Sequence, residues 1–177
     1  METGLISLEK LQNIVSNTFG DDYIIHNSER LLGGAQKHVY KVQCKNKFEF
    51  ILYIWHKDTT YFEDTDEYGF TSNSAALFEE NNTFMLRHGI SIPKMYFMDK
   101  TKKEHEFEFA MVEFIDGVDF DYIIEKQPER LKPALKSLND SIIKMHSIKR
   151  SQAGTISNPM HKSFSCIDYV FNGAEKV

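Results

Sequence analysis

Two adjacent glycines, Gly33 and Gly34, stand between two strand-like stretches of the chain, and Gln36 follows closely. Adjacent glycines let a turn approach a ligand closely, and they expose backbone N–H groups that can hydrogen-bond phosphate oxygens. The alternative interpretation is a glycine-rich hairpin that binds no ligand, because a glycine motif this short is not specific for phosphate binding. The pair is therefore a candidate phosphate-binding turn.

The segment 111–117, which reads MVEFIDG, is a candidate adenine-binding connector. We expect it to be an edge strand that runs into a connecting segment, and such a strand exposes unpaired backbone groups. These groups can hydrogen-bond the edge of an adenine while the neighbouring apolar side chains surround its ring. The alternative interpretation is an ordinary edge strand followed by an Asp-Gly turn.

Acidic and metal-binding residues give weaker signals. Glu79, with Glu80 as the alternative, adjoins the apolar side of a predicted helix, so it either points toward a sheet or faces solvent. The seven histidines show no metal-ligand spacing, and the aspartate pairs at 64/66 and 119/121 are expected to be solvated loop or helix-entry acids. No G-x-S-x-G motif is present. We therefore predict neither a metal site nor a serine hydrolase of that type.

The composition is that of a globular chain. Of its 177 residues, 41% are hydrophobic and 27% charged, and the net charge of −5 argues against a nucleic-acid binder, which usually has a basic face. No apolar run reaches the roughly 18 residues that a membrane span needs, and the first residues do not resemble a signal peptide. Cys44 and Cys166 lie far apart and form no redox motif. We expect a cytoplasmic protein that does not bind membranes.

Hydrophobic periodicity predicts an α+β fold rather than an alternating βαβ sheet. The expected helices are a first one between Ser7 and Gly20, a second over 73–87 and a third over 128–147, and the expected strands cover 28–32, 39–44, 48–56, 94–99 and 107–115. The third strand is apolar on both faces and should be central, whereas the fifth should bury one face and expose the other. The last helix carries a regular apolar stripe, which could support self-association: Leu131, Leu135, Leu138, Ile142 and Met145.

Taken together, the segments over about 27–149 resemble the aminoglycoside phosphotransferase family, which is related to choline kinases, and within it the enzymes that act on viomycin-type antibiotics. The resemblance implies a protein-kinase-like fold that uses ATP. Residues 1–115 would be the nucleotide-binding N-terminal lobe, a five-stranded antiparallel sheet with one packed helix. Residues 116–177 would be the exit from the connector and the start of an incomplete helical lobe.

The resemblance also assigns roles to individual residues. Gly33, Gly34 and Gln36 would lie over the phosphates, Glu79 would be the helix acid, Met111 would lie behind the adenine, and Glu113, Phe114 and Ile115 would hold it. In kinases a basic residue on the third strand pairs with the phosphates. Tyr53 stands where that residue is expected and Lys57 lies at the end of the strand, and the sequence leaves open which of them occupies the phosphate-pairing position.

One departure from the family concerns catalysis. The family's His-Gly-Asp-x-x-x-x-Asn segment is not found in the sequence, and Asp168 lacks both the preceding His-Gly and the following Asn. A positioned general base contributes about 10²–10⁴-fold to a rate. We therefore expect these residues alone to bind nucleotide without turnover, and Mg²⁺ and a cationic antibiotic or other hydroxyl-bearing acceptor to be bound only by a longer protein. The alternative is a non-catalytic kinase-like ligand-binding or interaction module.

Overall fold

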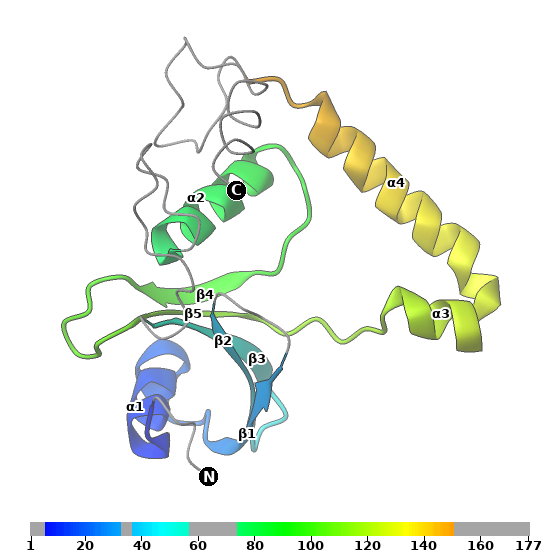
Figure 1. Cartoon of the computed structure of the whole chain (residues 1–177). Helices are drawn as coiled ribbons and strands as arrows, with labels where there is room; N and C mark the ends of the chain where they lie inside the picture. Colours follow the sequence, from blue (N-terminus) through cyan, green and yellow to red (C-terminus); the bar gives the residue numbers. More distant parts are fainter. Residues whose placement is uncertain (1–5, 33–36, 57–73, 151–177) are drawn as a thin grey trace, which may run out of the picture. The chain divides into compact units, whose positions relative to one another are not determined.

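The computed structural model describes residues 6–32, 37–56 and 74–150, which form an α+β fold with one antiparallel sheet (Figure 1). In chain order its elements are α1 (Leu8–Phe19), β1 (Ile25–Leu31), β2 (His38–Cys44), β3 (Glu49–Trp55), α2 (Ala75–Arg87), β4 (Met95–Asp99), β5 (Glu108–Glu113), α3 (Phe120–Lys126), the 3-10 turn η2 (Pro128–Arg130) and α4 (Leu131–Ser147). The predicted fold class is confirmed at this level.

The described residues form two compact units. The first, the sheet unit, contains 6–32, 37–56, 74–79 and 93–115. The second, the helical unit, contains 80–92 and 116–150. Because helix α2 contributes residues to both, its beginning is described with the sheet and its end with the helices.

Helix α1 begins and ends where its sequence predicts. The Ser7 side chain accepts a hydrogen bond from the Lys10 backbone N–H at 3.3 Å, which satisfies one of the free donors of the first turn. At the other end Gly20 has a φ of +106°, a conformation that L-residues with a Cβ rarely adopt. The apolar side of the helix buries Leu11, Ile14 and Val15.

Gly20→Ala is expected to lower the free energy of unfolding by about 1–2 kcal/mol. The cause is the backbone conformation alone, because an added Cβ would meet no atom within 4 Å. Gly117→Ala is the matched control, since Gly117 has equally open space and no positive φ. Urea denaturation followed by circular dichroism measures both variants. Equal stability of the two would contradict the strain at Gly20.

The sheet has the strand order β1-β2-β3-β5-β4, and every neighbouring pair is antiparallel. The central position predicted for the third strand is confirmed, since β3 lies between β2 and β5. Its register places Tyr53 opposite Val39 of β2 and Ala110 of β5. Residues paired in this way point to the same face of the sheet, which allows each face to be assigned residue by residue.

Strand β5 differs from its prediction in two respects. It is not an edge strand, because β4 pairs with its outer side and the Glu113 backbone N–H donates to the Lys94 carbonyl at 2.8 Å. It also has no solvent-exposed face, since both Ala110 and Val112 are buried. The alternation of glutamates with phenylalanines near its start suggested an exposed face. Further along the strand, the second face is covered because the strand is internal and a second hydrophobic cluster packs on it.

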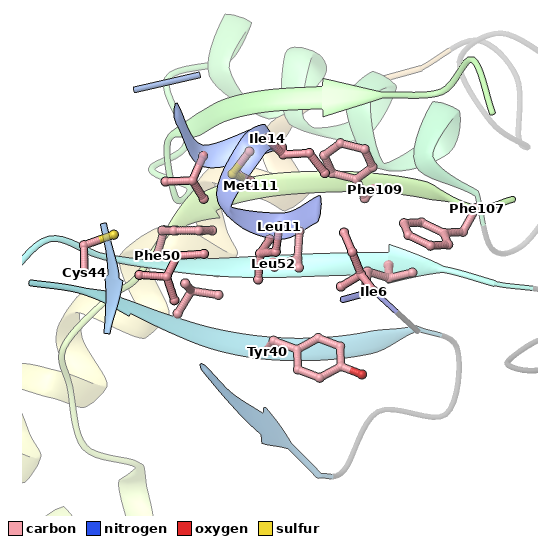
Figure 2. Packing of buried hydrophobic residues seen from close by; sticks show 14 residues of the cluster. Ile6, Leu11, Ile14, Tyr40, Cys44, Phe50, Leu52, Phe107, Phe109 and Met111 are labelled. Atoms are coloured by element: carbon pink, nitrogen blue, oxygen red, sulfur yellow. The ribbon is translucent and has the colours of Figure 1, made fainter. Parts of the chain in front are cut away.

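One face of the sheet, called the α1 face, packs against helix α1. Leu11 and Ile14 of the helix meet Tyr40 of β2, Leu52 of β3 and Met111 of β5 in a single layer (Figure 2). These side chains belong to a cluster of fourteen buried residues. Among the described residues, the α1 face is therefore a closed hydrophobic core.

In the helical unit, α3 is an element that the sequence analysis did not predict. Asp119 caps it by accepting a hydrogen bond from the Tyr122 backbone N–H at 2.8 Å, so one acid of the 119/121 pair has the helix-entry role expected for it. In α4 the apolar stripe is largely exposed, with Leu135 at 48% and Leu138 at 43% of full exposure. Among the described helices, none combines the length and apolar character needed to cross a membrane.

Candidate functional site

The opposite face of the sheet, called the α2 face, carries the features of a candidate site. Alternate side chains of the central strands point to it, because neighbouring residues of a strand face opposite ways. They form a hydrophobic cluster with Ala75 and Phe78 of α2. The strand residues of this cluster are Val39, Ile51, Tyr53, Trp55, Met95, Met98, Ala110 and Val112.

Three aromatic rings gather at one end of the α2 face. The Tyr53 ring lies 6.1 Å from that of Trp55 and 5.5 Å from that of Phe78, measured between centroids, and both contacts are edge-to-face. Trp55 and Phe78 are themselves 5.5 Å apart. Aromatic contacts of this kind stabilise a fold beyond the area that they bury. The cluster attaches the start of α2 to β3.

The ammonium group of Lys37 lies over these rings. Its Nζ is 3.8 Å from the centroid of Tyr53, 5.0 Å from that of Phe78 and 5.6 Å from that of Trp55. Burial lowers the pKa of Lys37 below its ordinary value, and burial also raises the pKa of the Tyr53 hydroxyl. Within the described residues, no carboxylate pairs with Lys37. The face thus holds a partly desolvated cation whose recorded contacts are aromatic.

A second lysine on this face, Lys41 of β2, already has partners within the protein. Its Nζ is 3.2 Å from an oxygen of Glu49 and 3.7 Å from the centre of the Phe114 ring. A hydrogen bond from Gln43 holds the pKa of Glu49 below its usual range, with a smaller contribution from Lys41. Glu49 therefore stays ionised, and the charge of Lys41 is balanced within the protein.

The predicted adenine connector begins where β5 ends. Glu113 is still part of the sheet, since it pairs with Phe50 and its side chain accepts from the Lys94 backbone N–H at 3.0 Å. Phe114 and Ile115 follow the strand, and within the described part of the chain no hydrogen bond to the backbone of either residue is recorded. The side chain of Ile115 is 60% exposed. Among the described residues, backbone groups without a recorded hydrogen bond therefore start at Phe114 rather than within the strand.

Two predicted site residues lie apart from this group. Met111 is fully buried in the core of the α1 face, so its side chain is on the side of the sheet opposite to Tyr53. Its two neighbours in β5, Ala110 and Val112, face the cluster that contains Tyr53, and Ala110 is the one directly opposite Tyr53. Glu79 makes an ion pair with Lys100, which follows β4, and no contact of Glu79 with β3 is recorded. The helix acid is thus engaged elsewhere in this structure.

The glycine turn and Lys57 are outside the described residues. Gly33, Gly34 and Gln36 fall in the gap 33–36, and Lys57 falls in the gap 57–73. Their predicted contacts with phosphate remain predictions. Of the basic residues near the expected phosphate-pairing position, Lys37 is the one whose contacts the structure describes.

Sequence reasoning did not single out Lys37, although a signal for it was present. Positions 37, 39 and 41 alternate along the second strand, and the short turn at 45–47 sets its register with the third strand. Period-two alternation places all three residues on the same face as Tyr53. The sequence pattern does not show how far the lysine side chain extends. In the structure it extends far enough to place the ammonium group over a ring on the neighbouring strand.

A cavity of about 450 Å³ in the helical unit is a second candidate. It is lined by the loop after α2, including Gly89, and by one side of α4. Its charged groups are already paired, because Lys136 contacts Asp140 at 2.7 Å and Lys144 donates to the Gly89 carbonyl. It therefore offers a ligand less unsatisfied charge than the α2 face.

Comparison with known proteins adds no further assignment. The sequence matches no family model, and no curated protein matches it. Within the described ranges, no three His, Cys, Asp or Glu side chains come together as a metal site. The geometry of the α2 face is consequently the main support for a function.

Proposed function

We propose that this chain is the nucleotide-binding, N-terminal part of an ATP-dependent small-molecule phosphotransferase. The observation that carries the proposal is the combination found on the α2 face. An ammonium group with no carboxylate partner among the described residues, an accessible apolar surface, and backbone groups after β5 for which no hydrogen bond is recorded in the described ranges lie in one compact unit. The ammonium group could bind the phosphates of a purine nucleotide, the apolar surface could cover the faces of its ring, and the backbone groups could hydrogen-bond the edge of the ring.

The apolar surface is formed by paired strands. Leu31 of β1 and Val39 of β2 are opposite each other and therefore share a face, with Ile51 buried in the next strand. Leu31 is 37% exposed and Val39 is partly exposed, so both present apolar atoms that an adenine ring could cover. In this proposal the backbone of Phe114 and Ile115 hydrogen-bonds the ring edge.

In this proposal the described residues bind the nucleotide. Within the described ranges no three His, Cys, Asp or Glu side chains form a group that could hold Mg²⁺, and this proposal assigns no transfer step to the described residues. The acceptor would be a small cationic antibiotic or another hydroxyl-bearing molecule, bound by parts that follow the sheet. This part of the proposal rests on the resemblance noted in the sequence.

ATP is expected to raise the melting temperature of the protein. At ten times its Kd, a ligand that binds only the folded state stabilises it by about 1.4 kcal/mol, which corresponds to about 3–6 °C for a domain of this size. Differential scanning fluorimetry with ATP, with and without Mg²⁺, measures the shift. Absence of a shift at millimolar ATP, with no heat of binding in calorimetry, would contradict the proposal.

A matched pair of variants locates the binding face. Leu31→Glu places a carboxylate on the α2 face and should abolish the ATP shift, because it repels the phosphates and removes apolar contact. Leu8→Glu makes the same change on α1, where Leu8 is 44% exposed, and should leave the shift intact. Equal shifts in both variants would place the nucleotide elsewhere.

A non-catalytic binding or interaction module is the second candidate, and Tyr53 is the observation that favours it. An aromatic residue stands where a kinase has a basic one, and its ring packs into the fold. Nucleotide binding that is indifferent to Mg²⁺, or tight binding to a protein partner without nucleotide binding, would favour this candidate.

A further inference from the structure

We propose that Lys37, the residue directly before β2, supplies the positive charge for the nucleotide phosphates that kinases take from a residue of the third strand. This inference rests on the proposed nucleotide-binding function and adds a residue to it. It explains how the α2 face can bind phosphate although Tyr53 is not basic.

The first argument is position. Tyr53 is central in the sheet and opposite Val39, two residues after Lys37. The Lys37 ammonium lies 3.8 Å from the centre of the Tyr53 ring, so the charge is in contact with the side chain that stands where a basic residue is expected. A residue directly before the neighbouring strand thus brings a cation to the part of the face where the third strand would have presented one.

The second argument is availability. The other lysines recorded on or near this face have carboxylate partners, since Lys41 pairs with Glu49 and Lys100 with Glu79. Lys37 has aromatic contacts and, within the described residues, no carboxylate. A ring satisfies an ammonium group less fully than an anion does, because a charge-assisted hydrogen bond is stronger than a cation–π contact. Phosphate oxygens can therefore draw Lys37 away from the rings.

The third argument concerns the alternative that Lys37 is structural. Its stem covers the ring cluster, and a lysine commonly packs its methylene groups on apolar surface while the charged group reaches water. Here the charged group itself is over the rings and is partly desolvated, which lowers its pKa. An anionic ligand would relieve that cost, whereas a purely structural role would be filled as well by methionine.

The test compares ATP with adenosine on the full 177-residue chain. Trp55 is its single tryptophan and lies 5.6 Å from the Lys37 ammonium, so its emission reports movement of that charge. Wild-type protein should bind ATP more tightly than adenosine. Lys37→Met should weaken ATP binding by about tenfold to a hundredfold and leave adenosine binding within about twofold, because only the phosphate contact is lost.

Two further variants complete the experiment. Lys37→Arg should recover most of the ATP affinity, since it keeps the charge. Lys45→Met removes an exposed lysine from the turn after β2 and should leave both affinities unchanged. Circular dichroism checks that each variant is folded.

Each outcome decides the inference. Unchanged ATP affinity in Lys37→Met, or an equal loss for ATP and adenosine, would overturn the role of Lys37 while nucleotide binding stands. If the wild-type protein binds ATP no more tightly than adenosine, the role of Lys37 is likewise overturned while nucleotide binding stands. Wild-type protein that binds neither would overturn the proposed function and this inference with it.

Discussion

Phe50→Ala is expected to lower the free energy of unfolding by about 3–5 kcal/mol, the range for removing a buried phenylalanine. Phe50 is fully buried on the α1 face, and its ring centre is 5.7 Å from that of Phe19 and 6.1 Å from that of Phe48. The loss would leave a cavity between α1 and the central strand. Since natural domains are stable by about 5–15 kcal/mol, this single change removes a large share of the total.

Urea denaturation followed by circular dichroism measures this loss. Phe97→Ala is the matched control, because Phe97 is on the edge strand β4 and is 39% exposed. Phe97→Ala should lower the free energy of unfolding by less than half as much as Phe50→Ala does. Similar losses for the two variants would show that the α1 face does not pack as described.

Trp55→Ala should have a comparable effect on the other face, about 3–5 kcal/mol. Trp55 is only 8% exposed, and its ring contacts both Tyr53 and Phe78. The change removes the surface on which the start of α2 packs, and it takes away one of the rings near the Lys37 ammonium. Circular dichroism is the appropriate probe, because this variant has no tryptophan.

Trp55→Phe is the control for this second prediction. It keeps an aromatic face against Phe78 and should lose less than half of the stability lost by the alanine variant. If Trp55→Ala lowers the free energy of unfolding by less than about 1 kcal/mol, the aromatic cluster does not hold α2 to the sheet.

Much of the fold could be predicted because local signals are strong. Ser7 and Gly20 delimit the first helix by capping chemistry, which depends only on neighbouring residues. The run 50–55 is apolar on both faces, and this property alone requires a central strand, as β3 proves to be. Helix α3 was missed because its seven residues are too few for a clear helical period.

Strand β5 shows where local signals fail. Its sequence begins with alternating acids and phenylalanines, which favours one exposed face. Whether a strand is internal depends on which strands pair with it, and the pairing with β4 is decided by the whole sheet. The same holds for Met111, whose side chain lies in the core of the α1 face, while its expected place behind the adenine stays a prediction. A shift by one residue exchanges the two faces of a strand.

By itself, the sequence of this protein determined the fold class, the number of strands and the central place of β3, because capping residues and hydrophobic period act over a few neighbouring positions. Only the tertiary structure decided that β5 is internal, that Glu79 pairs with Lys100, and that Lys37 lies over Tyr53. Each of these depends on contacts between residues that are distant in sequence or that lie on neighbouring strands. The last two also depend on how far a side chain extends. Such contacts form only when the whole sheet is assembled.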